Sequence, residues 1–218
     1  MLKLYSAPLS SNARRVWIAL LEKQLAFDLI QMQLDGDQFT AEFTALNLMQ
    51  RVPVLVDDGV TVIESLAILD YLEAKYPTPP LLPSDPGAIA RVRMAEILTI
   101  TEIQPATLPL LKRMVEMDVP HPVLDHAKDR ITRGLQVLAG LLTPGPYVAG
   151  DGFTLGDIVA GTIIPGLPMF GIELQPYPNV LAWCDRLAQR PSWQQTAPAP
   201  EVVQAALPTI RKILSARY

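Results

Sequence analysis

Cysteine is nearly absent from the chain, whose 218 residues include only Cys184. One cysteine forms no disulfide within a chain, so the sequence is typical of a reducing compartment, and we expect a cytoplasmic protein. The N-terminus also lacks the apolar segment and the small-residue cleavage site of a secretory signal peptide. Because no cysteine precedes residue 184, thiol–disulfide exchange by a Cys-X-X-Cys pair is excluded near the N-terminus.

Long hydrophobic runs and clusters of one charge are missing as well. No stretch approaches the roughly 18 apolar residues of a membrane span without a charge or a proline, so no transmembrane helix is expected. The 18 basic and 22 acidic residues give a net charge of −4 at pH 7 and are dispersed, which argues against nucleic acid or an anionic membrane as the partner. His121, between Pro120 and Pro122, and His126, five residues later, lack an accompanying ligand set, so no metal site is expected.

Proline, in contrast, is abundant at 21 residues and marks a boundary in the chain. Five of the ten residues of "PTPPLLPSDP" (77–86) are proline, which is typical of a stiff, extended linker. Before this stretch, apolar β-branched runs alternate with helical patterns, and after it the strand signals nearly stop. The sequence therefore predicts a domain over residues 1–76, a linker over 77–86 and a second domain over 87–218.

The pattern before the linker predicts the order β-α-β-α-β-β-α. Its clearest element is "VPVLVDDGVTVI", a hairpin of two β-branched runs around Asp57-Asp58-Gly59. The expected elements are a strand over 2–5, a helix over 12–24, a strand over 27–34, a helix over 40–47, the hairpin over 52–63 and a helix over 66–76.

The second domain is expected to be an all-α bundle, which makes the fold class α+β. "FTLGDI" predicts how one of its helices begins: Thr154 caps the helix, and Asp157 reaches back to the Thr154 backbone N–H, a capping box with Asp in place of Glu. Phe153 and Ile158 form the matching hydrophobic staple. The helical patterns cover residues 88–117, 123–142, 155–164, 180–189 and 202–216.

Pro53 in "QRVPVL" begins the expected third strand, a position where proline is normally unfavourable. A cis Val52-Pro53 bond would make the position acceptable and would leave the Val52 backbone free to pair with an extended peptide. The sequence therefore predicts a binding edge at Val52, in a domain whose order of elements is thioredoxin-like.

Five segments together resemble the soluble (cytosolic) glutathione transferases over essentially the whole chain: "LYSAPLSSNARRVWIAL", "ALNLMQRVPVL", "ESLAILDYL", "YVAGDGFTLGDI" and "YPNVLAWCDRLAQRPSW". The nearest class is zeta, which includes maleylacetoacetate isomerases, and a related bacterial class such as chi is an alternative. The resemblance implies a thioredoxin-like N-terminal domain that binds glutathione as a substrate, without a metal, and a helical domain that contributes the electrophile pocket. It also implies a homodimer and a role in detoxification.

Two departures from the zeta pattern bear on the reaction. The chain reads Ser10-Ser11-Asn12 where zeta enzymes typically read Ser-Ser-Cys, and it has Met169 ahead of "QPYP", where the class carries an arginine for its acidic substrate. An anionic dicarboxylate would lose its charge-assisted partner. We therefore expect conjugation of glutathione to small hydrophobic electrophiles. The alternatives are a glutathione-dependent cis-trans isomerase of the maleylacetoacetate type and a non-catalytic interaction module.

The resemblance singles out Ser10, and the position of this serine suits the chemistry that glutathione requires. Glutathione must lose its thiol proton to become a nucleophile, and the thiolate is favoured by a hydroxyl that donates to the sulfur and by the positive end of a helix. Ser10 lies at the strand-to-helix turn and matches the catalytic serine of serine-type transferases. The rivals are Ser11 and Tyr5, since other classes use a tyrosine near the end of the first strand. The plainer reading is a helix cap, a role that we assign to Ser11 or Asn12.

The expected glutathione contacts gather around Glu64-Ser65 at a helix start. There the Ser65 hydroxyl and backbone N–H groups hold the γ-glutamyl carboxylate and Glu64 meets its ammonium, although a plain capping pair is the alternative. Val52, before Pro53, pairs with the cysteinyl backbone. The remaining expected contacts are Ser11, with Gln38 and Arg51 at the glycine carboxylate, and Leu9, Gln104 and Leu108 in the electrophile pocket.

Two further features have mainly structural readings. Arg14 and Arg15 are placed to steer an anionic tripeptide, but we expect one of them to form a structural ion pair. Cys184 in "LAWCDRL" is expected to be a small core residue rather than a nucleophile.

Overall fold

A computed structural model of the chain describes residues 1–33 and 36–217. The chain forms two compact units. The first unit consists of residues 1–82 and 190–198, and the second consists of residues 83–189 and the segment from residue 199 onward. The segment 190–198 therefore belongs to the first unit, although it follows most of the second unit in sequence.

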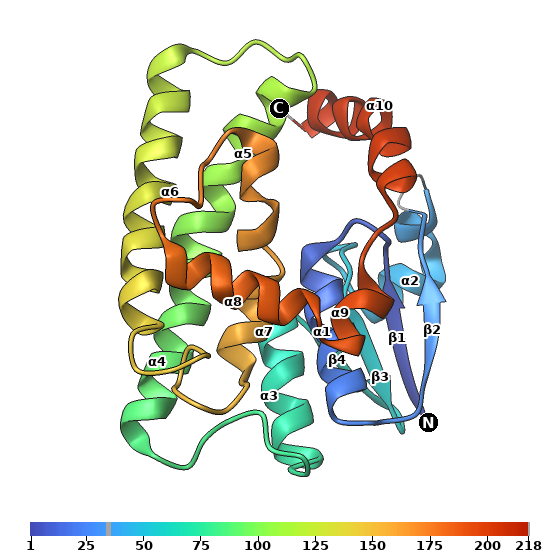
Figure 1. The fold of residues 1–218 in the computed structure, drawn as a ribbon. Helices are drawn as coiled ribbons and strands as arrows, with labels where there is room; N and C mark the ends of the chain where they lie inside the picture. Colours follow the sequence, from blue (N-terminus) through green and yellow to red (C-terminus); the bar gives the residue numbers. More distant parts are fainter. Residues whose placement is uncertain (34–35, 218) are drawn as a thin grey trace. The chain divides into compact units, whose positions relative to one another are not determined.

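A four-stranded mixed sheet forms the centre of the first unit, in the order β2-β1-β3-β4 (Figure 1). Strand β1 (Leu2–Ser6) runs parallel to β2 (Phe27–Gln31) and antiparallel to β3 (Val54–Asp57), and β3 pairs antiparallel with β4 (Val60–Ile63). Leu4 and Leu55 face each other across β1 and β3 and are completely buried. Apolar pairs of this kind stabilise the sheet and direct one of its faces into the core.

Helices cover both faces of this sheet. Helix α1 (Ser11–Glu22) packs against α3 (Ser65–Lys75), while α2 (Ala41–Leu46) lies on the other face (Figure 1). The contact between the rings of Tyr5 and Phe43, with centroids 5.7 Å apart, fixes α2 on the face opposite Leu4, because successive strand residues point to opposite faces. A single 3₁₀ turn, η1 (Asp37–Phe39), precedes α2.

Helix α9 (Pro191–Thr196), which the sequence did not predict, packs on α1. Both ends of α1 hold it: the Arg190 guanidinium donates to the Glu22 carboxylate at 2.9 and 2.6 Å, and Arg14 donates to the Thr196 hydroxyl at 3.1 Å. Six residues are too few to show helical periodicity, so these tertiary contacts, rather than a sequence pattern, account for the helix.

The predicted order β-α-β-α-β-β-α is confirmed, and with it the thioredoxin-like first unit of an α+β fold. The hairpin turns at Asp58 and Gly59, whose φ angles of 49° and 88° suit a two-residue turn with positive φ at both positions. The strand predicted over 27–34 is shorter than expected, because β2 ends at Gln31; Leu34 lies outside the described residues.

The Val52-Pro53 peptide bond is cis, as the sequence predicted. The binding edge predicted at Val52 does not run along a side of the sheet, because β3 is an inner strand, paired on both sides with β1 and β4. Pro53 directly precedes β3, so the ladder of the sheet ends before it reaches Val52. The backbone of Val52 makes no hydrogen bond to any other described residue, and it is therefore available beyond the end of the strand.

The second unit is helical, apart from an isolated bridge between Tyr147 and Gly150. Its first predicted helix, 88–117, is divided by a π-helical turn, and the predicted helix 155–164 ends early and is followed by a 3₁₀ segment. The elements are α4 (Pro86–Leu98), the π-turn η2 (Thr99–Ile103), α5 (Gln104–Met114), α6 (His121–Leu141), α7 (Leu155–Gly161), the 3₁₀ helix η3 (Ile164–Phe170), α8 (Pro178–Ala188) and α10 (Pro200–Arg217).

The predicted capping box begins α7 and does more than cap. Thr154 and Asp157 form the reciprocal bonds of the box. The Asp157 carboxylate, which has no exposed surface, also accepts hydrogen bonds from the backbone N–H of Val148 at 2.9 Å and from the indole N–H of Trp183 at 2.8 Å. One side chain therefore joins the start of α7 to the preceding loop and to α8.

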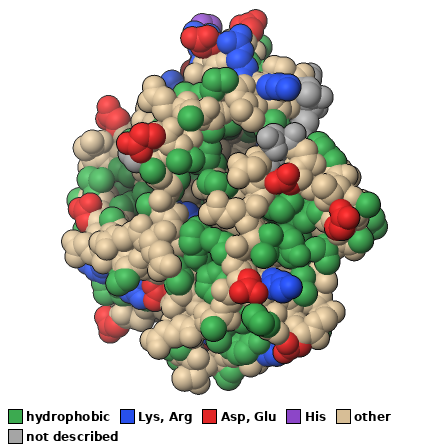
Figure 2. Space-filling model, turned by 90° about the vertical axis from the view of Figure 1, so that its right-hand side faces the viewer, with side chains coloured by type: hydrophobic (Ala, Val, Ile, Leu, Met, Phe, Trp, Pro, Cys, Tyr) green, Lys and Arg blue, Asp and Glu red, His purple; other side chains and the backbone are tan. Residues whose placement is uncertain are grey.

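The face of the molecule drawn in Figure 2 shows no strong segregation of charge. On this face, acidic and basic side chains among the described residues are interspersed with hydrophobic ones, and the basic ones form no extended patch. No helix within the described residues is long and apolar enough to cross a lipid bilayer.

Candidate functional site

The register of the sheet brings the sequence-predicted residues of the first unit to one end. Tyr5 pairs with Val54, and Val54 pairs with Ile63, so the residues after β1, before β3 and after β4 lie at the same end of the sheet. Because β2 is parallel to β1, the segment after Gln31 starts there too. The predicted residues gathered at this end are Leu9, Ser10, Ser11, Gln38, Arg51, Val52, Pro53, Glu64 and Ser65.

Ser10 ends the turn between β1 and α1. Its backbone N–H donates to the Ala7 carbonyl at 3.0 Å, and its hydroxyl oxygen accepts from the Ala13 backbone N–H at 3.2 Å. Ser10 is therefore the N-cap of α1, and the prediction that Ser11 or Asn12 has this role was wrong, because the helix begins at Ser11. The bond uses a lone pair of the hydroxyl and leaves its proton available for donation.

Two electrostatic features favour an anion beside Ser10. The side chain is half-buried, and it stands at the N-terminus of a 12-residue helix, where the aligned peptide dipoles leave partial positive charge. The hydroxyl donates no hydrogen bond to another described residue. The turn therefore combines an available proton with a favourable potential, which suits a thiolate or another anion.

Tyr5, the rival hydroxyl, lies in a packed environment. Its ring contacts Phe43 and joins a buried cluster that includes Met32 and Val52. The strand continues one residue beyond it, to Ser6. This packing accounts for Tyr5 as a core residue of the face covered by α2.

The N-terminus of α3 is strained and uncapped. Glu64 has φ 66° and ψ 122°, a conformation that a residue with a side chain adopts at a cost of about 1–3 kcal/mol and that clusters at ligand sites. No side chain caps the helix, so the N–H groups of its first turn are left for another acceptor. These features fit an anion site, and the positive φ of Glu64 is a feature that the sequence did not signal.

Ser65, the first residue of α3, is buried and is contacted by Arg15 of α1. Arg15 is 1% exposed, and its Nη1 donates to Ser65 Oγ at 3.5 Å and to Asn12 Oδ1 at 2.8 Å. Neither Arg14 nor Arg15 is confirmed as a steering residue on the surface, because Arg15 is buried and Arg14 holds α9. The signal that marks Arg15 was present in the sequence: it is a charge within the apolar stripe of α1, next to Val16.

The remaining predicted contacts of the first unit differ in exposure. Gln38 is buried in η1, where its Oε1 accepts from the Gly36 backbone N–H at 3.2 Å. Arg51 is exposed, and its carbonyl accepts from the Asn47 side-chain amide at 2.8 Å, which holds the loop that leads to Val52. Arg51 therefore presents its guanidinium to solvent beside the end of the sheet.

Gln104 and Leu108, the predicted pocket residues of the second unit, lie one turn apart at the start of α5. Both are half-buried. Leu108 borders a small pocket of about 240 Å³ whose other residues are mostly apolar. The pocket is lined by Leu108, Pro109, Lys112, Asp118, Val119, Pro120 and Val123.

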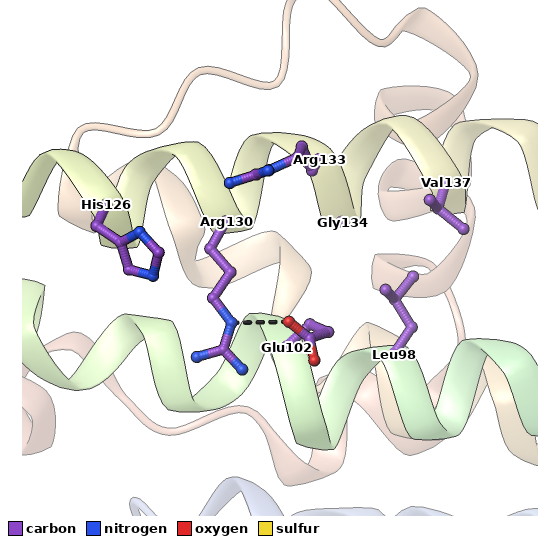
Figure 3. Close-up of a pocket in the computed structure, with 7 residues that line it drawn as sticks. All are labelled: Leu98, Glu102, His126, Arg130, Arg133, Gly134 and Val137. Carbon is purple, nitrogen blue, oxygen red and sulfur yellow. Dashed lines mark hydrogen bonds and ion pairs between the residues drawn. The ribbon is translucent and has the colours of Figure 1, made fainter.

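A larger groove of about 370 Å³ lies on the second unit, between α4 with η2 on one side and α6 on the other. Figure 3 shows Arg130 reaching from α6 to Glu102, an ion pair of 2.7 Å that spans the groove. Leu98 and Val137 lie at one end and His126 at the other (Figure 3). Within α6, Gly134 permits the close approach to η2, because a Cβ there would lie 2.6 Å from Cγ1 of Ile103.

The described residues provide neither a metal-binding cluster nor a reactive cysteine thiolate. Among the described residues, no group of three or more His, Cys, Asp or Glu side chains is arranged to hold a metal ion. Burial, with a smaller effect of Asp185, raises the pKa of Cys184 to about 12. The thiol is therefore protonated at neutral pH, as expected for a packing residue.

Comparison with known proteins gives a consistent result over most of the chain. Residues 4–80 match the family model of the glutathione S-transferase N-terminal domain, and residues 91–191 match that of the glutathione S-transferase C-terminal domain. Maleylacetoacetate isomerase of Mus musculus is 38% identical over 183 residues, which cover 81% of this chain and 83% of the mouse protein. Glutathione S-transferase Z1 of Arabidopsis thaliana is 35% identical over 205 residues, 90% of this chain and 91% of the plant protein.

A solved structure is similar over the same length. The crystal structure of a glutathione S-transferase from Methylobacterium radiotolerans, in complex with glutathione sulfonate, superposes with a TM-score of 0.77 at 35% identity. The match covers 90% of this chain and 94% of that chain.

Proposed function

Because the chain belongs to the glutathione S-transferase family, we propose that it binds glutathione, stabilises its thiolate and transfers it to small hydrophobic electrophiles. The observation that carries the proposal is Ser10, a hydroxyl whose proton is available at the N-terminus of α1. A free thiol of pKa about 8.5 is only a few per cent ionised at pH 7, so a donor that favours the thiolate increases the concentration of nucleophile directly.

Glutathione would lie along the end of the sheet, within the proposed domain 1–76. The uncapped N-terminus of α3, with the Ser65 hydroxyl, holds the γ-glutamyl carboxylate, and Glu64 meets the ammonium. The unpaired backbone of Val52, fixed by Pro53, pairs with the cysteinyl residue, as one strand adds to another. The remaining proposed contacts are Ser11 beside the thiol, and Gln38 and Arg51 at the glycine carboxylate.

The reaction requires only the thiolate and an electrophile. The thiol proton leaves to solvent, the sulfur forms a bond to the electrophilic carbon, and either a leaving group departs with its electron pair or the adduct takes up a proton. Beyond the proposed linker 77–86, the domain 87–218 contributes Gln104 and Leu108 of α5 to the proposed electrophile pocket. Leu9 is the contact proposed in the first domain. The apolar side chains of Leu9 and Leu108 suit a hydrophobic co-substrate.

We expect Ser10→Ala to lower kcat well over tenfold, equivalent to more than about 1.4 kcal/mol of transition-state stabilisation. Turnover would be measured with glutathione and a panel of an aryl halide, an isothiocyanate and a hydroperoxide. The substitution also removes a helix cap, at about 1 kcal/mol of stability. Asp85→Ala is the matched control, because Asp85 caps α4 through the same kind of bond, to the Ala88 N–H at 2.8 Å.

The control variant should lose comparable stability and keep its turnover. A Ser10→Ala protein with the kcat of the unaltered chain would contradict the assignment and would turn attention to Ser11 and Tyr5. A chain that binds no glutathione in calorimetry would refute the proposed function as a whole and would favour a non-catalytic interaction module.

Isomerisation is the second candidate, and the similarity to the mouse protein named maleylacetoacetate isomerase favours it. The substitution of arginine by Met169 argues against it, because an acidic substrate would lose a charged partner. Maleylacetone belongs in the same panel for this reason. Its glutathione-dependent isomerisation, at a rate above that of conjugation of every other compound, would reverse the order of the two candidates.

A homodimer in the cytoplasm is the proposed state of the protein. Support comes from apolar side chains exposed beside the groove between α4 and α6: Met94, Ile97 and Val137 are 50%, 54% and 46% exposed. Exposed apolar residues clustered on one surface mark sites of association. The single cysteine supports a reducing compartment.

A further inference from the structure

Arg15 is a charged side chain enclosed within the first unit. It lies on α1, one and a half turns after Ser10, and 1% of its surface is exposed. One terminal nitrogen, Nη1, donates to both Asn12 Oδ1 at 2.8 Å and Ser65 Oγ at 3.5 Å. A single nitrogen with two protons therefore connects the first turn of α1 to the first residue of α3.

The polarity of these bonds constrains the Ser65 hydroxyl. A guanidinium only donates, so Ser65 Oγ acts as an acceptor toward Arg15. The hydroxyl has one proton, and it donates that proton to no other described residue. Because Ser65 is 7% exposed, few orientations of the hydroxyl are open, and the proton is directed to whatever occupies the N-terminus of α3.

We propose that Arg15 is a positioning residue, which fixes the Ser65 hydroxyl as a donor to the γ-glutamyl carboxylate of glutathione, while Asn12 holds Arg15 in place. This inference rests on the proposed function. Arg15 acts through Ser65 rather than by contact with the ligand, since almost none of its surface is exposed. The inference also gives Asn12, which replaces the cysteine of the zeta pattern, a role distinct from that of Ser10.

The test measures the Kd of glutathione by calorimetry in a double-mutant cycle. Asn12→Ala and Arg15→Lys should each raise the Kd about three- to tenfold, because the hydroxyl loses its fixed orientation and a hydrogen bond to a charged group is weakened. The kcat at saturating glutathione should stay within about twofold, since the thiol end of the site is unchanged. In a Ser65→Ala background, the same two changes should alter the Kd less than about twofold, because no hydroxyl remains to be oriented.

Arg14→Lys is the matched control. Arg14 is the preceding residue of the same helix, and it donates to the Trp193 carbonyl at 3.3 Å and to the Thr196 hydroxyl, which ties α1 to α9. This variant should lower the Tm and leave the Kd of glutathione unchanged.

A purely structural role of Arg15 gives a different result. It predicts equal changes in Kd with and without the Ser65 hydroxyl, or a fall in Tm at constant Kd, and either result overturns the inference. If Arg15→Lys fails to fold, Asn12→Ala at a half-buried position decides the matter in the same cycle. Unaltered protein that fails to bind glutathione would refute the proposed function. Normal binding by the unaltered protein, with equal changes in Kd in the presence and absence of the Ser65 hydroxyl, would refute only the role of Arg15.

Discussion

Ser10 and Ser65 share one arrangement of hydrogen bonds. Each hydroxyl oxygen accepts from a donor of the protein, the Ala13 N–H in one case and the Arg15 guanidinium in the other. Each therefore keeps its proton for an acceptor outside the fold. The two serines differ in the proposed ligand group, a sulfur at Ser10 and a carboxylate at Ser65, and both of these groups are anionic.

Asp57 is a residue whose titration should affect stability. Burial raises the pKa of its carboxyl, but hydrogen bonds from Lys75 at 2.6 Å, Tyr76 at 2.8 Å and Tyr71 at 2.9 Å outweigh burial and hold the pKa below its ordinary value. A carboxyl with a depressed pKa in the folded state adds stability above its unfolded pKa, near 3.9, and the protein loses that stability as the pH falls further.

We expect Asp57→Asn to lower the free energy of unfolding by about 1–3 kcal/mol at pH 7, because hydrogen bonds to a charged acceptor are lost in a buried position. The difference from the unaltered protein should shrink below about pH 4, where the carboxylate itself becomes protonated. Urea unfolding at several pH values measures both. Asp58→Asn, at an exposed neighbour, should change stability by less than about 0.5 kcal/mol. A difference that is constant with pH would contradict the assignment.

At the scale of elements, the start of α7 shows that a capping residue predicted from local sequence also makes tertiary hydrogen bonds. The sequence predicted the capping box, because its two residues are three apart and bond to each other's backbone. It did not predict the bonds from Val148 and Trp183, since those donors lie 9 and 26 residues away. Asp157 therefore holds together three segments of the second unit.

Asp157→Ala should lower the free energy of unfolding by about 3–5 kcal/mol, because four buried donors lose their acceptor at once. Trp183→Phe removes one of those donors together with its bond, and should cost closer to 1 kcal/mol. Chemical denaturation of both variants measures the difference. Equal losses in the two would show that the carboxylate serves Trp183 alone.

The elements that sequence reasoning predicted are those with local causes. The hairpin follows from Asp58 and Gly59, which tolerate positive φ, and the helices follow from apolar periodicity. The π-turn η2, the 3₁₀ helix η3 and α9 were missed, since each depends on contacts with distant residues, such as the approach of Ile103 to Gly134. The cap of α1 was predicted one or two residues too late. Serine and asparagine are both favourable N-cap residues, so only the backbone conformation shows which of the three neighbouring residues is the cap.

At the scale of the whole molecule, the sequence was sufficient to predict the part of the candidate site that the first unit forms. The residues of the first unit gather at one end of the sheet because the strand order and register require it. Arg15 was predicted as a steering residue or an ion-pair partner and not as a buried donor to Ser65. Its charge within the apolar stripe of α1 signals burial, but only the structure identifies its partners. The proposed electrophile pocket depends on helix side chains, such as Gln104 and Leu108, whose neighbours one sequence does not identify.

The proposed homodimer gives a prediction at this scale. Light scattering coupled to gel filtration should give twice the mass of the chain. Placing charges in the apolar border of the groove, by Ile97→Glu with Val137→Glu, should shift the protein to monomer, because each charge would be desolvated in the interface. Val60→Glu, at an exposed apolar residue of the β4 hairpin, is the control and should leave the mass unchanged. A dimer that persists with both charges would place the interface elsewhere.

The protonated state of Cys184 has a practical consequence for studying the site. It is the only thiol of the chain, and its pKa of about 12 means that the protein contributes almost no thiolate at neutral pH. The ultraviolet absorption of a thiolate in a mixture with glutathione therefore belongs to glutathione alone. The ionisation of the bound sulfur is thus open to direct optical titration in the unmodified protein, with and without the Ser10 hydroxyl, and no cysteine has to be removed first.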